Sequence, residues 1–317
     1  MPSVAVIIVT WNASTLLERV LDSLEKQTCQ PARIVIVDNG SADVAHLPSI
    51  IARHENCELI PLPENRGFAA ANNVGIVRCP EADLIALLNP DAFPEPEWLA
   101  ELVKAAERHP EAASFASRLL NDGDDTRLDG AGDYLTVAGK PGRRGHMQPA
   151  EDRYLDYEPV FAPCAAAALY RRKALMECGG FDERFFCYVE DVDLAFRMLL
   201  AGHLTHYVPT AAVRHVGSAI TGRRSEFSVY HGQRNLIFNY VKNMPWPLFW
   251  AFLPLHLMLN LLYLAAAFAA GRGRVTWRSK RDALRQLPIM WCERRKIQAM
   301  RRVSSVKVAR MLKFSLW

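Results

Sequence analysis

The chain has 317 residues, of which half are apolar and 23% are charged. This composition can form one or two buried cores, and it argues against an intrinsically disordered protein. The net charge of +4 is unevenly distributed, because residues 271–317 contain 14 Lys and Arg but only 2 Asp and Glu. That tail therefore carries +12 and residues 1–270 carry −8, which indicates that the tail meets an anionic surface.

The seven cysteines are scattered, and no C-x-x-C pair occurs among them. Their pattern indicates neither a zinc knuckle nor a redox motif, and favours reduced, buried thiols in a cytosolic protein. The N-terminus leads directly into a strand pattern, without a charged segment followed by a cleavable apolar one. We therefore expect no secretory signal peptide.

Strand and helix patterns alternate along the first 90 residues. Asn12 or Ser14 is expected to cap the first helix, in which leucine and valine recur at helical spacing between residues 16 and 24. Such alternation predicts a parallel sheet with helices on both faces. In chain order, the segments are a strand at Val4–Val9, this helix, a strand at Ile34–Val37, a helix around 43–54, a strand at Cys57–Ile60, a helix at Ala69–Arg78 and a strand at Leu84–Leu88.

The rest of the chain divides into three stretches. Residues 119–160 are rich in Gly, Asp, Arg and Pro, and they are predicted to be irregular. A second α/β stretch runs from Val160 to about Gly217, and a helical region follows it. We place the boundary between the α/β part, residues 1–225, and the helical part, residues 226–317.

Polar clusters follow three of the predicted strands. They are Thr10-Trp11-Asn12, Asp38-Asn39-Gly40-Ser41 and Asn89-Pro90-Asp91. In α/β sheets, ligands bind in the crevice at the carboxyl ends of the strands, so these clusters are the first sign of a binding site. The first glycine of the chain is Gly40, and its late position excludes the glycine-rich first turn of dinucleotide-binding folds, P-loops and sugar-nucleotidyltransferases. A bound phosphate would therefore be held mainly by side chains and a metal ion.

Five ordered motifs occur in the chain: V-I-I-V-T-W-N at 6–12, V-D-N-G-S at 37–41, E-N-R-G-F-A at 64–69, L-N-P-D-A at 88–92, and F-D-E-R-F-F with E-D-V-D-L between 181 and 194. Together they resemble the family 2 glycosyltransferases over about residues 3–220, and within that family the bacterial rhamnosyltransferases of surface-polysaccharide assembly. The resemblance implies a GT-A fold, an α/β architecture with a mostly parallel sheet. Its nucleotide-binding half would span about 1–118, and its acceptor and catalytic-base half about 119–225.

The resemblance assigns Asp91 to the family's D-x-D motif, in which the second carboxylate binds a divalent ion that bridges the donor's phosphates. Here Asn89 replaces the first Asp of that motif. His215 matches a histidine that completes the metal site in related enzymes. Mg²⁺ or Mn²⁺ would neutralise the charge that develops on a leaving nucleoside diphosphate. Without the other motifs, an Asx turn at Asp91 and a structural role for His215 would be the simpler interpretations.

The donor pocket is also assigned by resemblance. Asp38 matches a carboxylate that hydrogen-bonds a pyrimidine ring, and an acceptor-only carboxylate suits the imide N–H of uracil or thymine. The donor should therefore be a UDP- or dTDP-sugar, although the sequence at 38–41 is also typical of a simple turn. The other residues expected at the donor are Thr10, Asn12, Asn65, Arg66, Gly67 and Asn89, with Arg223 and Arg224 as a phosphate clamp.

Glu190 and Asp191 begin a helical pattern, where the helix dipole favours ionised carboxylates. The resemblance places the general base for the acceptor hydroxyl at Asp191, with Glu190 shaping the site beside it. A plain acidic helix start, in which Asp191 and Asp193 are interchangeable, is the competing interpretation.

Residues 247–270 contain no charged side chain and are long enough as a helix to cross a bilayer of about 30 Å. A single crossing would place the basic tail outside the cell, against the positive-inside tendency. We therefore expect a re-entrant or interfacial hairpin at the cytoplasmic face of the inner membrane, with the tail on anionic headgroups and no nucleic-acid partner. A buried core helix is the alternative.

These features predict an inverting, metal-assisted glycosyltransferase that moves one sugar, rhamnose from dTDP-rhamnose in the first instance, onto a lipid-linked or polysaccharide acceptor. A processive synthase should show a Q-x-x-R-W motif after the catalytic Asp, and residues 232–235, G-Q-R-N, lack it. A catalytically silent, membrane-associated protein that binds nucleotide sugars is the alternative from another class, and a turnover assay would separate the two.

Overall fold

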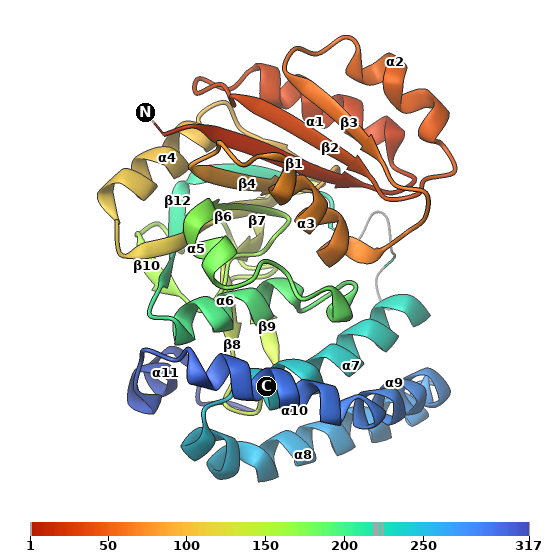
Figure 1. Ribbon diagram of the computed structural model, residues 1–317, viewed down its shortest axis with the longest axis vertical. Helices are drawn as coiled ribbons and strands as arrows, with labels where there is room; N and C mark the ends of the chain where they lie inside the picture. The colour runs from red at the N-terminus through yellow and green to blue at the C-terminus, as the bar shows by residue number, and fades with distance from the viewer. Residues whose placement is uncertain (1, 218–221, 223–224, 317) are drawn as a thin grey trace.

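The computed structural model describes residues 2–217, 222 and 225–316. One sheet runs through the upper part of the molecule, and helices from the end of the chain form a layer below it (Figure 1). Ten described strands form this sheet, eight of them in the order β10-β12-β6-β11-β4-β1-β2-β3, while β5 pairs with β12 and β7 with β6. A separate pair, β8 and β9, lies between the sheet and the helical layer (Figure 1).

The strands are β1 (Val4–Thr10), β2 (Arg33–Asp38), β3 (Cys57–Pro61), β4 (Leu84–Leu88), β5 (Ala92–Pro94), β6 (Ala112–Asn121), β7 (Asp124–Ala131), β8 (Asp133–Leu135), β9 (Pro141–Arg143), β10 (Glu158–Val160), β11 (Ala167–Arg171) and β12 (Leu204–His215). The helices of the α/β part are α1 (Ser14–Glu25), α2 (Leu47–Ile51), α3 (Gly67–Arg78), α4 (Trp98–Arg108), α5 (Arg172–Glu177) and α6 (Glu190–Leu200), with short 3₁₀ turns at Val44–His46 and Glu183–Phe185. After them come α7 (Glu226–Asn243), α8 (Trp246–Ala269), α9 (Gly273–Arg285), α10 (Leu287–Ala299) and α11 (Ser305–Met311).

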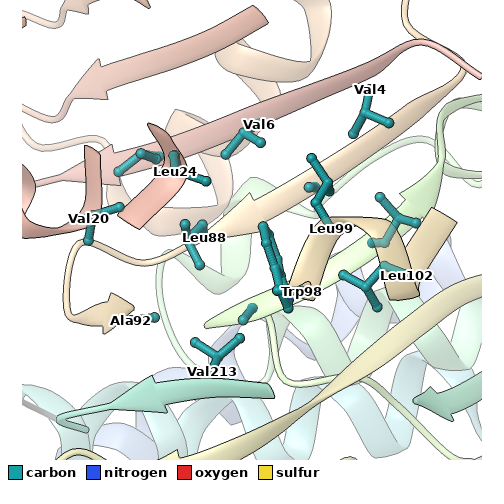
Figure 2. Close-up of a cluster of buried hydrophobic side chains, with 14 of the residues drawn as sticks. Val4, Val6, Val20, Leu24, Leu88, Ala92, Trp98, Leu99, Leu102 and Val213 are labelled. Atoms are coloured by element: carbon teal, nitrogen blue, oxygen red, sulfur yellow. The ribbon is translucent and has the colours of Figure 1, made fainter. Parts of the chain in front are cut away.

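Strand β1 is buried along its whole length, which explains its continuous apolar sequence. Its alternate residues enter two different cores, because successive side chains point to opposite faces of a sheet. Val4, Val6 and Ile8 pack with α1 and α4, whereas Ala5, Ile7 and Val9 pack with α3 and the helices after β11. Figure 2 shows the first of these cores, in which Trp98 of α4 lies among Leu88, Leu99, Leu102 and Val213.

The sheet is mixed. Strands β1, β2, β3 and β4 run parallel, as the alternating pattern predicts. The next strand, β11, runs antiparallel to both β4 and β6. Because of this reversal, the loop before β11 lies at the carboxyl end of β4. Residues from both halves of the chain therefore meet at the carboxyl ends of the central strands.

Two local predictions are wrong and a third is only partly right. Ala13, not Asn12 or Ser14, precedes α1, and the amide of Ser14 donates a hydrogen bond to Oδ2 of Asp43 at 3.1 Å. Asn12 instead accepts a hydrogen bond from the Ala42 amide at 2.8 Å and so ties the β1 end to the loop after β2. The helix expected around 43–54 is present but shorter, since a 3₁₀ turn at Val44–His46 leads into α2, which has Pro48 in its first turn and ends at Ile51. Residues 119–160 are not irregular, since they contain β7 to β10 and the end of β6.

Helix α8 is continuous through Pro254, and the chain reverses only afterwards, at Gly271 with a φ of +72°. The prediction that residues 247–270 dip and return is therefore wrong. By length and composition α8 could cross a membrane, and only 11% of its most apolar 18-residue stretch is buried in the protein. It is thus not the buried core helix of the alternative interpretation either. One face of α8 packs on the protein through Phe249, His256 and Leu259.

Candidate functional site

A cavity of about 470 Å³ opens below the carboxyl ends of β1 and β4, between the sheet and α7. Several predicted site residues line it together, although they are far apart in the sequence. They are Asn65, Gly67, Asn89, Asp91, Glu190, Asp191 and His215. Four others, Thr10, Asn12, Asp38 and Arg66, are not among the described residues that line the cavity, and Arg223 and Arg224 fall outside the part of the chain that the structure describes.

Asp91 and His215 are adjacent because β5 pairs with the end of β12, which sets Ala92 opposite His215. The Nε2 atom of His215 lies 3.4 Å from Oδ1 of Asp91. On its other side, Nδ1 lies 2.7 Å from Oδ2 of Asp129. Burial lowers the pKa of His215, but its contacts with Asp129 and Asp91 outweigh burial and raise the pKa.

Asp129 is buried and is also bonded by the Arg143 guanidinium. Its burial acts to raise the pKa of the carboxyl, yet His215 and Arg143 bring it down to about 2. An ionised Asp129 accepts the Nδ1 proton of His215. When the imidazole is neutral, Nε2 is then the lone-pair nitrogen, on the side of Asp91. This carboxylate–histidine pair is the usual support of a metal-binding imidazole, and sequence reasoning missed Asp129.

Asp191 lies at the second position of α6. Its Oδ1 accepts a hydrogen bond from the Val192 amide at 2.8 Å, and its Oδ2 accepts one from the Ala165 amide at 3.2 Å. Burial raises the pKa of Asp191, against the helix-dipole expectation, while these two amides act in the opposite direction. Burial and the Asp191 charge raise the pKa of Glu190 well above its usual range.

Asp193 has entirely different surroundings. It is fully buried, and its carboxylate meets Lys242 at 2.7 Å and Arg197 at 2.9 Å. Asn243 also donates a hydrogen bond to it at 2.7 Å. Asp193 thus joins α6 to α7 and is not among the described residues of the cavity wall, so Asp191 and Asp193 are not interchangeable.

The loop before α6 is held in an unusual conformation, with φ between +65° and +70° at Phe186, Tyr188 and Val189. Asn235 of α7 stabilises it by donating hydrogen bonds of 2.7–2.9 Å to the carbonyls of residues 185, 187 and 188. Gly67 lies against this loop at a φ of +86°, and a Cβ there would be 2.5 Å from the carbonyl oxygen of Phe186. Only glycine fits at this position, which explains why the N-R-G turn at the start of α3 ends on glycine.

Outside the cavity wall, Asp38 and Thr10 are partners in the parallel register of β1 and β2. Asp38 Oδ2 accepts a hydrogen bond from the Ser41 amide at 3.2 Å. Its Oδ1 and the Thr10 hydroxyl are buried, and neither has a hydrogen-bond partner among the described residues. Beside them, Asn39 donates to Asn65 at 3.0 Å and accepts from the Arg66 amide at 2.9 Å. These contacts join the second and third motifs.

Sequence reasoning missed a second group in the cavity, formed by Asp133, Cys164 and Arg143. Ligand atoms of Asp133, Cys164 and Asp191 lie within 4.8 Å of one another. The sequence D-G-A-G-D at 129–133 was the available signal, but it falls in the stretch that lacked any periodic pattern.

Residues 5–179 match the family model described as glycosyl transferase family 2. An N-acetylglucosaminyl-diphospho-decaprenol L-rhamnosyltransferase of Mycobacterium tuberculosis is 32% identical over 255 residues, which cover 71% of this chain and 80% of the relative. An O-antigen chain rhamnosyltransferase of Salmonella anatum is 27% identical, over 68% of this chain and 66% of its own.

Solved structures are similar as well. A mannosyltransferase of Pyrobaculum calidifontis with GDP-Man and Mn²⁺ has a TM-score of 0.57 at 21% identity, over 95% of this chain and 86% of that one. GalNAc-T7 with UDP, GalNAc and Mn²⁺ has a TM-score of 0.62 at 17% identity, over 76% of this chain and 48% of its own. At these identities the likeness shows the fold alone. The chain therefore belongs to glycosyl transferase family 2, and it is a glycosyltransferase with the GT-A fold that resembles bacterial rhamnosyltransferases.

Proposed function

We propose that this protein transfers one sugar, with inversion, from a dTDP- or UDP-sugar to a lipid-linked saccharide, and that rhamnose is the first sugar to test. The observation that carries the proposal is the single cavity wall shared by Asp91, His215 and Asp191. The residues proposed to hold the donor's phosphates through a metal ion, Asp91 and His215, therefore face the same cavity as the proposed base, Asp191. The rhamnosyltransferase relatives support the choice of sugar, and the lipid-diphosphate substrate named for one of them supports the acceptor class.

The donor set at Asp91 and His215 fits a divalent cation. One carboxylate oxygen and one imidazole nitrogen lie 3.4 Å apart, and Asp129 fixes the tautomer that presents Nε2. A bound Mg²⁺ or Mn²⁺ would supply the positive charge that stabilises the leaving nucleoside diphosphate. Next to Asn39 of the cavity wall, the buried oxygens of Asp38 and Thr10 offer hydrogen-bond acceptors, and the Thr10 hydroxyl offers a donor, for the imide edge of a pyrimidine.

Asp191 is the carboxylate best suited to take the acceptor's proton. Its two amide contacts stabilise the ionised form, whereas Glu190 has a buried oxygen that finds no donor in the described chain. The higher pKa that burial gives Asp191 also makes it a stronger base than an exposed carboxylate. Glu190 then shapes the site next to the base.

A membrane surface is proposed at the lower edge of the molecule, where α8 and α9 lie side by side (Figure 1). We define this docking face by the exposed apolar residues of α8, which are Trp250, Leu257, Met258, Leu261, Leu262 and Phe268, and by the exposed Arg274, Arg278, Arg281 and Arg285 of α9. Apolar side chains beside arginines are typical of helices that lie in the membrane interface.

Contacts on the inner side of α8 favour this in-plane orientation over a crossing. The ring of His256 stacks on Tyr240 with centroids 4.0 Å apart, and its Nδ1 lies 2.8 Å from the Ala138 carbonyl oxygen. Asn260 of α8 accepts a hydrogen bond from Lys280 of α9. A helix that crossed the bilayer would lose all of these contacts.

The proposal is tested by incubating the full chain with Mn²⁺, a lipid-linked saccharide acceptor and a panel of dTDP-, UDP- and GDP-sugars. We expect transfer of a single residue from a dTDP- or UDP-sugar, and slow hydrolysis of the same donor without acceptor. Tight donor binding with neither transfer nor hydrolysis would identify a catalytically silent binding protein instead. Polymeric products would identify a processive synthase.

A further inference from the structure

The catalytic roles above leave one buried group of the cavity without a function, the carboxyl of Asp133. Asp133 is only 8% exposed, at the start of β8, and it lines the cavity. Its backbone is fixed by hydrogen bonds with Ala162, because its N–H donates to the Ala162 carbonyl at 2.8 Å and the Ala162 N–H donates back at 3.2 Å. Its Oδ1 is buried and has no hydrogen-bond partner in the described chain. A carboxyl in this position costs stability, so a ligand that satisfies it is expected.

The neighbours of Asp133 and Asp191 determine which of these two carboxyl groups is ionised first. Burial raises the pKa of Asp133 well above its usual range, the charge of Asp191 raises it further, and Arg143 opposes both. Asp191, in contrast, accepts two backbone hydrogen bonds. Asp191 is therefore the first of the pair to lose its proton, and Asp133 keeps a carboxyl group that can both donate and accept a hydrogen bond.

A metal ion is a poor occupant for this group. The Cys164 thiol would have to be deprotonated to bind an ion, and burial raises its pKa. Arg143 already brings a positive charge to the same place, since it acts on Cys164, Asp133 and Asp191 together. A neutral, hydroxyl-bearing ligand suits these surroundings better.

The position of Asp133 points to the acceptor. Ligand atoms of Asp133 and Asp191, the proposed base for the acceptor, lie within 4.8 Å of one another. The turn between β8 and β9 runs from this point to α8, where the Ala138 carbonyl meets His256. The cavity wall continues in the same direction through Lys140 to Tyr263 of α8. A saccharide carried by a lipid would reach Asp191 from this side.

We propose that Asp133 is a positioning residue for the acceptor, and that its carboxyl binds a second hydroxyl of the acceptor sugar, beside the hydroxyl whose proton Asp191 removes. The acceptor is then a sugar with two neighbouring free hydroxyls on the ring that is glycosylated. Asp133 exchanges no proton in the reaction, since the nucleophile's proton goes to Asp191 and the donor's nucleoside diphosphate leaves. This inference rests on the proposed function.

The test compares the full-length protein with Asp133→Asn and Asp133→Ala, using the lipid-linked acceptor, the same acceptor lacking the neighbouring hydroxyl, and water as acceptor. We expect Asp133→Ala to lower kcat/KM for the complete acceptor roughly 10- to 100-fold. Hydrolysis of the donor by water should stay within about 3-fold. Asp133→Asn keeps the shape and an N–H donor, so it should recover part of the loss.

The deoxygenated acceptor separates positioning from a structural role. For the original protein, loss of that hydroxyl should cost about as much as Asp133→Ala does, and the two losses should not add, because they remove the same contact. Fully additive losses, or an equal fall in donor hydrolysis in Asp133→Asn and Asp133→Ala, would overturn the inference. If the original protein hydrolyses donor but transfers to no saccharide, the proposed function itself fails. That result differs from additive losses and from an equal fall in donor hydrolysis, which concern Asp133 alone.

Discussion

Asp191 and Asp193 are two residues apart on one helix, and their environments are opposite. Asp191 faces the cavity, while Asp193 holds Lys242 and Arg197 in the interior. Asp191→Asn should leave donor binding within a few-fold and lower turnover by ~10²–10⁴, the usual scale for loss of a general base. Asp193→Asn is the matched control.

In Asp193→Asn, the buried Arg197 loses its carboxylate partner and Lys242 keeps only Asp182. The free energy of unfolding should therefore fall by about 3–5 kcal/mol. Turnover per folded molecule should remain near normal at low temperature. Thermal unfolding and single-turnover rates, measured on Asp191→Asn and on Asp193→Asn, test both predictions. Near-normal turnover in Asp191→Asn, together with its loss in folded Asp193→Asn, would show that the wrong carboxylate carries the chemistry.

Asp129 provides the test of the metal site, because it touches His215 and is not itself expected to touch the ion. Asp129→Asn removes the charge that fixes the imidazole tautomer. The apparent affinity for Mn²⁺, read from the metal dependence of donor hydrolysis, should fall about 10- to 100-fold. Chelation by EDTA should abolish activity of the unmodified protein, and full activity in excess EDTA would remove the metal from the account.

The sequence predicted Asp91, Asn89, His215, Glu190 and Asp191 as site residues, and the fold brings them to one cavity. These residues follow strands or begin helices, where position in the sequence indicates position in the fold. Asp133 and Arg143 could not be found in this way. Their relation to Asp191 depends on a small β8–β9 pair inside a Gly- and Asp-rich stretch, and such stretches carry no periodicity.

At the scale of elements, α7 organises the loop that presents Asp191. Asn235 donates to three carbonyls of that loop, and Arg234 donates to the carbonyls of Arg184 and Phe185 at 2.9 Å. The residues of the G-Q-R-N segment, which was compared with a processive-synthase motif, thus include two that stabilise the strained loop. No periodic pattern reveals such a contact, because it joins residues about 50 positions apart.

Asn235→Ala should leave buried carbonyls without donors, lower the free energy of unfolding by about 1–3 kcal/mol and reduce turnover together with it. Asn239→Ala is the control, because Asn239 is equally buried one turn further along α7 and bonds Asn243 instead of the loop. It should lower stability without a matching loss of turnover per folded molecule. Calorimetry and steady-state rates check both, and equal loss of turnover in the two variants would contradict the role of Asn235.

At the scale of the whole molecule, the charge asymmetry seen in the sequence is the basis of the proposed docking face. The sequence predicted the contact with a membrane from residues 247–270 and the basic tail, but it placed a turn inside the apolar segment. Pro254 is compatible with a helix here, and the reversal at Gly271 instead lays α9 along α8. Part of the tail is also buried, since Lys280 and Arg294 are inside the helical layer, so not all 14 cations are available to headgroups.

Replacing Trp250, Leu261 and Phe268 by Ser should reduce binding to vesicles that contain anionic lipid, and neutralising Arg274 and Arg278 should reduce it further. Each arginine near such a surface contributes about 1 kcal/mol. Val77→Ser is the control, because Val77 is 66% exposed on α3, outside the docking face. Vesicle sedimentation measures the effect, with donor hydrolysis expected to persist in every variant.

Topology gives an independent check of the same face. Single cysteines placed beyond residue 300, in a background without Cys292, should resist an impermeant thiol reagent in intact cells and react after lysis. Labelling from outside would show that α8 crosses the membrane, and the in-plane orientation would then be wrong.

The central claim is a single displacement at the anomeric carbon, with Asp191 as base and no covalent intermediate on the enzyme. The most direct measurement is the anomeric configuration of the product, determined by NMR on the disaccharide released from the lipid-linked product, with the configuration of the donor sugar measured in the same way. The account predicts that the new glycosidic bond has the configuration opposite to that of the donor. A product that retains the donor's configuration, or a glycosyl adduct detected on the protein by mass spectrometry, would contradict it.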